Sequence, residues 1–345
     1  MDTAFAKLTV CIMTKENPVN IIRQINYYSN YDFPVIILDA SLKRISKIEN
    51  QNITYHHLPD LPFHKRLIFL GECVMTEFMV LQADDDFHGA RGLLKNLNFL
   101  IRNPEYCCSQ GTFIRIQSQR PLFWWPDYKN QNRLRIDNDE SSIRIEQFAL
   151  SNMHFVYSVM ATDTFRKITS CFDNIQTGVL LMNELAFNFT LGLFGKYRTM
   201  PGFYCARDKS RRLSSMDFIQ WENSSLISDY LQFKRNLVEL YTQYSNLTEI
   251  EAEILLNRII KAYKERDISK KQFNSLRNHN MGQWTKIKNA TRKINLFGTR
   301  PFSSALFRFS SWNYIFNLIL HNSLFIFLLD FMEIRKIFRK DFSNI

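Results

Sequence analysis

Three consecutive carboxylates, Asp84, Asp85 and Asp86, are the side chains of this sequence best suited to chemistry. They follow the apolar run 78–81, whose length and composition are typical of a buried parallel strand. If the chain stays extended past Ala83, Asp84 and Asp86 point to one side and Asp85 to the other. Two carboxylates on one side form a hard oxygen site suited to Mg²⁺ or Mn²⁺. A solvated acidic turn is the alternative for three aspartates alone.

Strand and helix patterns alternate along the first 116 residues. Strands are predicted at 8–13, 34–38, 53–57, 78–83 and 106–116, and helices at 18–29, 64–75 and 89–102. Such alternation indicates βαβ units and a mostly parallel sheet. Ligands of these sheets bind at the carboxyl ends of strands, near the point where the strand order reverses. Polar residues follow three of the strands, at 14–16, 39–41 and 84–86, so we expect these segments to meet in one site.

Further charged side chains follow in the next hundred residues. A strand is predicted at 155–161, a helix at 178–193, and strands at 197–200 and 203–206. Glu184 lies within the first two turns of that helix, among apolar neighbours. The last of these strands leads to a basic segment that begins at Arg207. An exposed acid on a helix and a solvated basic loop are the alternatives to a chemical role for these two residues.

Composition and charge limit the class of protein. The 345 residues are 46% apolar and 14% aromatic, as in a globular protein. The net charge of +11 is uneven: residues 206–345 hold 23 Lys and Arg against 13 Asp and Glu, whereas residues 1–205 hold 21 against 20. A basic region suits nucleic acid, anionic lipid or phosphorylated substrates as partners.

Several common site types are missing from the sequence. It has ten glycines but no Gly-x-Gly-x-x-Gly and no P-loop, which argues against a dinucleotide fold and a Walker-type phosphate cradle. Its six cysteines form no CxxC pair, and no HExxH or paired Cys/His spacing occurs. The first residues lack the pattern of a signal peptide. Free cysteines in apolar surroundings suit a reducing compartment, so we expect a cytoplasmic protein.

Residues 8–210 resemble bacterial glycosyltransferases of the GT-A fold, related to the family-2 group. The resemblance is carried by the opening 8–14, the strand end 38–41, the unit 64–86 with its Asp-rich end, and the pair 183–184 before Gly195. It implies an α/β fold: a GT-A (Rossmann-like nucleotide-diphospho-sugar transferase) core with a C-terminal helical extension. We accordingly expect a glycosyltransferase domain at 1–212 and a basic, mainly helical region at 213–345.

The resemblance also implies roles for individual residues. The base and ribose of a nucleotide sugar would be contacted by Thr14 and Glu16, and the base by Asp39. Asp84 and Asp86 would hold Mn²⁺ or Mg²⁺, and Glu184 occupies the position of the catalytic base. The full set expected to bind the nucleotide sugar is Thr14, Glu16, Asp39, Lys65, Asp84, Asp85 and Arg207. For Lys65 an ordinary solvated helix start is the alternative.

Two departures from the family refine the expected activity. The usual acid–acid pair is Asn183–Glu184 here, and the Gln-x-x-Arg-Trp element of processive synthases is missing. The prediction is therefore a metal-dependent, non-processive glycosyltransferase, inverting by family likeness, that acts in bacterial surface polysaccharide synthesis. A UDP-sugar is the favoured donor, and a glycan or lipid-linked hydroxyl the acceptor.

Two other functions stay open at this stage. A sugar-phosphate nucleotidyltransferase shares the α/β core and the metal, but that class carries a glycine-rich first loop and residues 14–18 have no glycine. A nucleic-acid-binding protein could use the basic C-terminal half. No recognised nucleic-acid motif occurs there, so we expect no nucleic acid partner.

Two segments outside the core have alternative interpretations. The aromatic stretch 121–128 suits either a substrate loop or a surface loop whose tryptophans pack on the sheet. In the C-terminal third, helices are predicted at 228–244 and 248–266. The apolar stretch 312–332 is interrupted by polar residues and precedes a basic cluster at 335–340. It suits either a helix on an anionic inner-membrane surface or a helix packed on protein.

Overall fold

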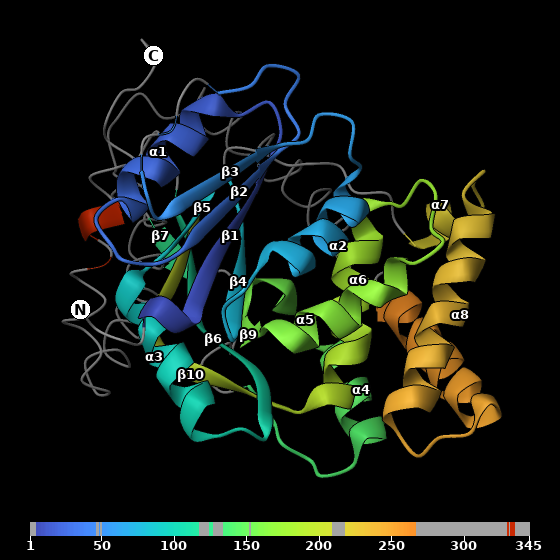
Figure 1. Cartoon of the computed structure of the whole chain (residues 1–345). Coiled ribbons are helices and arrows are strands. Elements are labelled where there is room, and N and C mark those ends of the chain that lie inside the picture. Colours follow the sequence, from blue (N-terminus) through green and yellow to red (C-terminus); the bar gives the residue numbers. More distant parts are fainter. Residues whose placement is uncertain are drawn as a thin grey trace, which may run out of the picture.

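One mixed sheet forms the centre of the molecule in the computed structural model (Figure 1), which describes residues 5–45, 48, 50–116, 124–126, 134–151, 153–208, 218–266, 330 and 332–334. Ten strands belong to this sheet within those residues. They are β1 Leu8–Thr14, β2 Val35–Asp39, β3 Ile53–His57, β4 Phe78–Ala83, β5 Asp86–His88, β6 Tyr106–Ile116, β7 Trp124–Pro126, β8 Arg135–Ile136, β9 Val159–Ala161 and β10 Lys196–Asp208.

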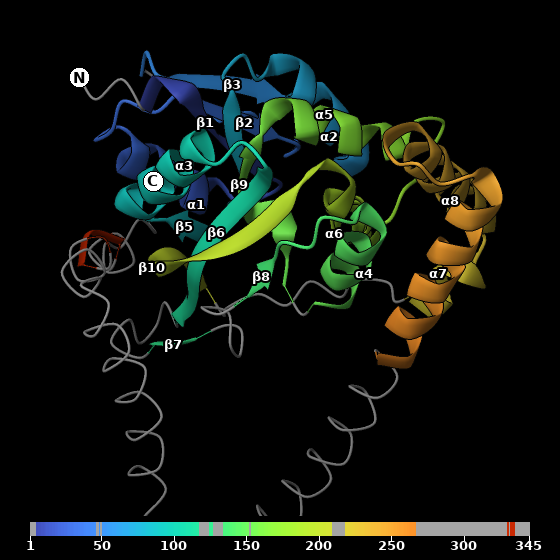
Figure 2. The ribbon, with the colours of Figure 1, turned by 90° about the horizontal axis from the view of Figure 1, so that it is seen from below.

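The strand order is β3-β2-β1-β4-β9-β6-β10-β5, with β7 beside β6 and β8 beside β10. The first four strands in this order are parallel, β9 runs antiparallel to both neighbours, and β6 and β10 are parallel. Figure 2 shows β6 and β10 side by side along the sheet. The chain moves outward from β1 to β3 and then returns to the other side of β1 as β4. The strand order therefore reverses between β1 and β4, where ligands of such sheets bind.

Helices cover both faces of the sheet (Figure 1). On one face lie α1 Pro18–Tyr28 and α3 Ala90–Arg102; on the other lie α2 Phe63–Cys73, α4 Ser141–Leu150, α5 Thr162–Thr169 and α6 Leu180–Phe194. Short 3₁₀ turns occupy Phe5–Lys7, Phe155–Tyr157 (η3) and Ser170–Phe172 (η4). The α/β fold with a mostly parallel centre is thereby confirmed.

Strand β1 explains why two cores form. Its side chains alternate, so Val10 and Ile12 pack under α1 and α3, whereas Cys11 and Met13 face the second core with α2 and α6. All seven residues of β1 are buried, as expected for a central parallel strand covered on both faces.

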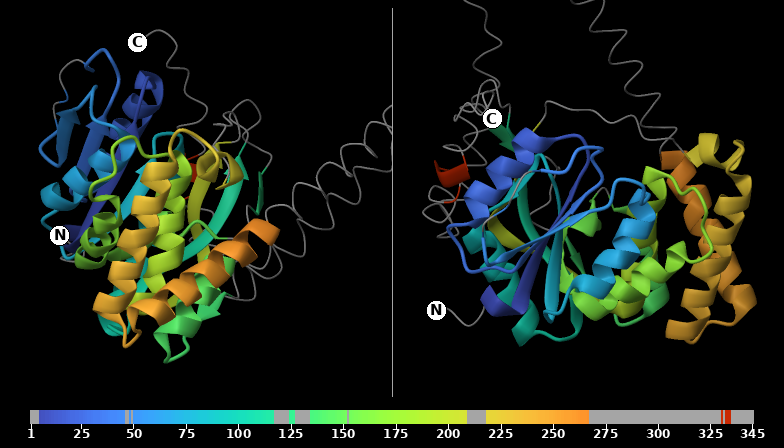
Figure 3. Two further views of the ribbon diagram at one scale, coloured as in Figure 1. Left: turned by 90° about the vertical axis from the view of Figure 1, so that its right-hand side faces the viewer. Right: turned by 45° about the horizontal axis from the view of Figure 1, so that its top comes forward.

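The helices after residue 218 pack onto α6. They are α7 Phe218–Glu222, α8 Ile227–Tyr244 and the helical residues 249–266. Figure 3 shows them beyond α6, on the side away from α1. Tyr241 donates its hydroxyl hydrogen bond to the Phe189 carbonyl across 2.8 Å, and Trp221 is fully buried against Tyr230 and Phe233. These helices thus share the core of α6; the expected domain boundary at 212/213 lies outside the described residues.

A short C-terminal piece, residues 330 and 332–334, lies against the α1–α3 face. The fully buried Asp330 carboxylate accepts hydrogen bonds from Arg91 Nη1 at 2.8 Å and from the Gly92 amide at 3.3 Å, in the first turn of α3. Ile334 is buried in the same core. A carboxylate at a helix N-terminus is favourable because it accepts otherwise unpaired amide hydrogens.

The structure differs from the sequence-based expectations in four local places. Residues 86–88 form a strand, and the polar region near 141–150 is helix α4. Segment 155–161 is a 3₁₀ turn followed by a shorter strand, and 196–208 is one strand with register shifts instead of two. Segment 312–329, the basic cluster at 335–340 and most of the aromatic stretch lie outside the described residues. No helix among the described residues has the length and hydropathy needed to span a bilayer.

Candidate functional site

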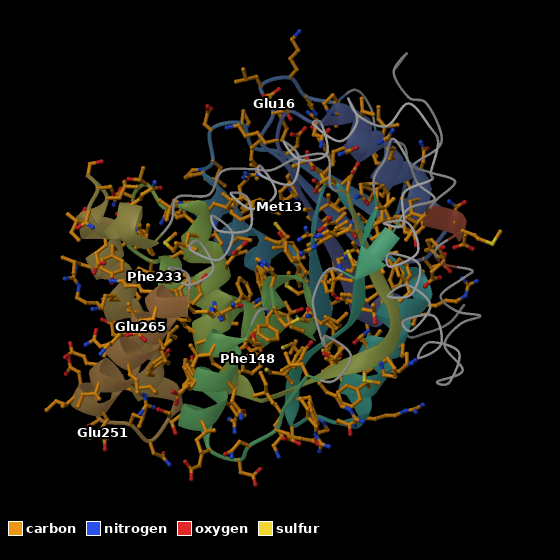
Figure 4. The ribbon with its side chains drawn as sticks, turned by 180° about the vertical axis from the view of Figure 1, so that it is seen from behind. Met13, Glu16, Phe148, Phe233, Glu251 and Glu265 are labelled. Atoms are coloured by element: carbon orange, nitrogen blue, oxygen red, sulfur yellow. The ribbon has the colours of Figure 1, made fainter. Side chains whose placement is uncertain are left out.

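A cleft of about 740 Å³ opens at the carboxyl ends of β1 and β4. Its wall includes the Thr14–Glu16 segment, the acids Asp84 and Asp85, and Glu184 of α6. Figure 4 labels Met13 near the end of β1 and Glu16 above it, whereas Phe233 lies to the left, among the helices after residue 218. The volume is within the range of small-molecule and cofactor sites. The cleft thus brings together residues that are 170 positions apart in the sequence, from Thr14 to Glu184.

The acidic segment bends instead of staying extended. Strand β4 ends at Ala83, residues 84 and 85 form a turn, and β5 begins at Asp86. The expected alternation of side chains therefore does not hold, and it is Asp84 and Asp85 that line the cleft. Thr14 donates its hydroxyl hydrogen bond to Asp84 Oδ2 at 2.7 Å. Burial, and then the neighbouring charge of Asp84, raise the pKa of Asp85 to about 6.

Asp86 lies behind the cleft wall, paired with Arg207. The distance from Arg207 Nε to Asp86 Oδ2 is 3.2 Å, and both side chains are largely buried. The guanidinium carbon lies 4.7 Å from the ring centre of Phe113 and 4.8 Å from that of Tyr157, so the cation is stacked between aromatic rings. The structure therefore places neither Asp86 nor Arg207 among the residues that line the cleft, although Arg207 acts electrostatically on Asp85.

The buried side-chain amides of two glutamines support the acidic turn. Gln24 of α1 donates from Nε2 to the backbone carbonyls of Asp84, at 3.1 Å, and Asp86. Its own Oε1 accepts a 2.6 Å hydrogen bond from Gln82, and Gln82 Oε1 accepts from Tyr28 at 2.6 Å. Both glutamines are fully buried. Because every link is a directed hydrogen bond inside the core, the network fixes the turn on α1.

The loop after β1 is held by the loop after β2. Glu16 has a φ of 53°, its amide donates to Ser41 Oγ at 2.7 Å, and its Oε1 accepts from the Leu42 amide at 2.7 Å. Asp39 is fully buried: its oxygens accept from the Ser41 amide at 2.8 Å and the Tyr55 hydroxyl at 2.6 Å. Glu16 lines the cleft, whereas Asp39 lies behind it.

Arg66 is the basic residue that the first turn of α2 brings to the cleft. Its Nη1 donates to the Thr14 carbonyl at 3.1 Å, whereas its buried Nε has no hydrogen-bond partner among the described residues. Lys65, one position earlier, is not part of the cleft wall. The difference follows from helix geometry, because neighbouring positions point about 100° apart.

Glu184 lies in the cleft next to His154, the residue before η3. The distance from His154 Nδ1 to Glu184 Oε1 is 3.2 Å, and the side chains are 37% and 35% exposed. Burial by itself raises the pKa of Glu184, but the hydrogen bond and charge of His154, together with Arg207, hold it below its usual value. Glu184 is therefore ionised at neutral pH and able to accept a proton.

Asp229 of α8 fixes the loop that leads into α6. Its Oδ1 accepts from the Gln176 amide at 3.2 Å, and its Oδ2 from the amides of Thr177 at 2.9 Å and Gly178 at 3.2 Å. Gly178 has a φ of 61°, and a Cβ there would lie 2.4 Å from Nδ1 of His64. Both the left-handed backbone and this close approach require glycine. A helix of the C-terminal region thus shapes one edge of the cleft.

Two acids in the wall of the cleft, Asp84 and Asp85, bear on whether it could hold a metal ion. Among the described residues, no group of three or more His, Cys, Asp or Glu is close enough to form a complete metal site. Asp84 and Asp85 are adjacent carboxylates, and burial, followed by the charge of Asp84, raises the pKa of Asp85. Mg²⁺ and Mn²⁺ bind through one or two carboxylates and take their other ligands from phosphates and water. The pair fits such an ion.

Four supporting residues escaped the sequence analysis. Gln24 had a usable signal, since it is a polar residue on the buried side of an amphipathic helix. The sequence could not show that Arg66 lines the cleft and Lys65 does not, because this depends on which side of α2 faces the cleft. His154 and Asp229 gave no local signal, because their partners lie 30 and about 50 residues away.

No family model matches this chain, and no curated protein matches it. Crystal structures of S. aureus TarS are similar to it over 74% of its length. TarS 1–349 in complex with UDP aligns with a TM-score of 0.47 at 12% sequence identity, and the alignment covers 70% of that chain. For the complex with UDP-GlcNAc the TM-score is 0.46, the sequence identity 13% and the share of that chain covered 72%. A further TarS structure aligns with a TM-score of 0.46 at 11% sequence identity, and this chain spans only 43% of the length of that chain.

Proposed function

We propose that this protein is a metal-dependent, non-processive glycosyltransferase that moves a sugar from a nucleotide-sugar donor to a hydroxyl of a glycan or lipid-linked acceptor. One observation carries the proposal. A single cleft at the reversal of strand order contains an acidic turn after β4, a polar loop after β1, and an ionised carboxylate, Glu184, on a separate helix. These are the parts needed to hold a diphosphate and to accept a proton from an attacking hydroxyl.

In this proposal the parts of the donor occupy different parts of the cleft. The loop from Thr14 to Glu16 contacts the nucleoside, and Arg66 in the cleft wall offers its positive charge to the diphosphate. Asp84 and Asp85 would hold Mn²⁺ or Mg²⁺, which offsets the charge of the departing diphosphate as a Lewis acid. The sequence resemblance makes a UDP-sugar the first donor to test. With a lipid-linked acceptor, the protein would act at the inner membrane surface.

The residues of the chain perform the transfer by orientation and proton removal. Glu184 accepts the proton of the acceptor hydroxyl, whose oxygen then attacks the anomeric carbon while the bond to the diphosphate breaks. Because one carboxylate acts as base in a direct displacement, we expect inversion at the anomeric carbon. Asp86 and Arg207 stay behind the wall, where their ion pair anchors the acidic turn to β10.

The test separates donor binding from chemistry. Purified protein is titrated with UDP-, GDP-, CMP- and dTDP-sugars with and without Mn²⁺, and the thermal midpoint is recorded, since a ligand of the native state raises it. We expect Asp84→Asn to abolish the metal-dependent shift and Glu184→Gln to keep it while losing transfer or donor hydrolysis. The matched control is Asp163→Asn, which changes an exposed carboxylate of α5, on the same face of the sheet as α6. Absence of any nucleotide-dependent shift in the wild type would contradict the proposal.

A further inference from the structure

His154 and Glu184 come together from different parts of the chain. His154 lies in the segment between α4 and η3, and Glu184 lies in the second turn of α6. Nδ1 of the imidazole is 3.2 Å from Oε1 of the carboxylate. Both side chains are about one-third exposed. Glu184 lines the cleft, whereas His154 contacts it from a position outside the cleft wall. The contact engages one carboxylate oxygen and leaves Oε2 for another partner.

Burial has the largest effect on the pKa of Glu184, and among the charged groups that the structure describes His154 has the largest. Among the described residues, His154 and then Arg207 of β10 act on Glu184, and the buried Tyr157 of η3 interacts with it electrostatically. Arg207 is paired with Asp86 and stacked between rings. His154 is therefore the cationic or hydrogen-donating group that touches Glu184 directly.

We propose that His154 is the positioning residue of Glu184, an inference that rests on the proposed glycosyltransferase function. Its Nδ1–H fixes Oε1, so that Oε2 is the oxygen that receives the proton of the acceptor hydroxyl. Both the neutral Nδ1–H tautomer and the protonated ring can donate this hydrogen bond. The proton passes from the hydroxyl to Oε2, the acceptor oxygen bonds to the anomeric carbon, and the electron pair of the broken bond leaves with the nucleoside diphosphate.

The amide variant His154→Asn distinguishes this role from general packing. An asparagine Nδ2 can occupy about the place of the histidine Nδ1, whereas a glutamine amide reaches the place of Nε2 and an alanine has no donor. We expect kcat to fall roughly 10- to 100-fold in His154→Ala, because misplacement of a catalytic group has effects of this size. We expect His154→Asn to recover most of the rate and His154→Gln less. Donor affinity, measured by calorimetry, stays within about twofold of the wild type.

The pH profile gives a second readout that a structural role would not move. Because His154 lowers the pKa of Glu184, its removal raises that pKa, and the acid limb of kcat/KM moves to higher pH in His154→Ala. His56→Asn, on β3 outside the cleft wall, is the matched control and leaves the profile unchanged. In the double variant with Glu184→Gln, loss of His154 has no further effect, because residues that act as a unit are not additive.

The outcomes separate the pairing from the proposed function. If Glu184→Gln stops transfer but His154→Ala keeps the wild-type rate and acid limb, the pairing is overturned and the function stands. If Glu184→Gln transfers at the wild-type rate, the assignment of the base fails. If His154→Ala loses donor binding or does not fold, and His154→Asn shows no recovery of kcat, the role of His154 is structural and the proposal is also overturned.

Discussion

The hydroxyl of Thr14 donates a 2.7 Å hydrogen bond to Oδ2 of Asp84 and so joins the ends of two neighbouring parallel strands. The two residues are 70 positions apart in the sequence. The bond orients the first carboxylate of the acidic turn toward the cleft. A hydrogen bond to a charged group contributes about 1.5–3 kcal/mol, which is more than a neutral one.

Replacing Thr14 by valine tests this relationship. The change removes the hydroxyl and keeps the branched shape, so we expect the fold to persist and the affinity for donor plus Mn²⁺ to fall roughly 10-fold or more. Calorimetric titration measures the affinity. Thr9→Val is the control, because Thr9 lies in the same strand at the far end from the cleft and bonds to Thr76. Equal losses of affinity in both variants would contradict a specific role for Thr14.

Asp85 gives a prediction for stability as a function of pH. Its pKa is raised to about 6 in the folded protein, so the folded state holds the proton more tightly than the unfolded state, where the pKa is about 4. Stability is therefore lost as pH rises from about 4 through 6, by at most about 3 kcal/mol, since partial exposure screens the charge. In Asp85→Asn this loss is missing.

Urea unfolding without divalent ions checks the pH prediction. We expect Asp85→Asn to be more stable than the wild type above pH 6.5 and equal to it near pH 4. Mn²⁺ should stabilise the wild type and leave the variant nearly unchanged. The control is Asp60→Asn, which removes an exposed carboxylate from the same cleft. An identical pH dependence for both variants would show that Asp85 is not the group responsible.

Gln24 is expected to support both the fold and the donor site. In Gln24→Met the carbonyls of Asp84 and Asp86 lose their buried donor, so we expect a stability loss of about 1–3 kcal/mol and weaker binding of donor plus Mn²⁺. Urea unfolding and calorimetry measure the two effects. Asn96→Leu removes a similarly buried amide in α3, away from the acidic turn, and should lower stability alone. Normal donor affinity in Gln24→Met would rule out the supporting role.

Asp229 is expected to control the edge of the cleft from α8. In Asp229→Asn an amide NH₂ faces the N–H groups of Thr177 and Gly178, so these two amides lose their acceptor. We expect faster hydrogen exchange over residues 174–182 and a stability loss of about 1–3 kcal/mol. Exchange mass spectrometry reports the segment directly. The exposed Asp163→Asn should leave its exchange unchanged. Unchanged exchange in Asp229→Asn would mean that the loop is held by other contacts.

The sequence by itself determined five of the strands and the place where the cleft opens along the sheet. The strands β1, β2, β3, β4 and β6 begin and end within one or two residues of the predicted bounds, because their apolar runs and polar ends are local signals. The acidic run at 84–86 and the polar loop at 14–16 were expected at the carboxyl ends of strands, and both segments contribute to the cleft wall.

Only the tertiary structure decided which of these side chains face the cleft. Asp86 pairs with Arg207, 121 residues further along the chain, and Asp39 accepts hydrogen bonds from Tyr55 and a backbone amide. Neither of these two aspartates lines the cleft. Glu184 is joined by His154, which the sequence analysis had not singled out. A strand or helix pattern depends on neighbours within a few positions, whereas the partner of a charged side chain depends on how distant elements pack. The spacing of residues therefore located the site, and long-range packing selected its members.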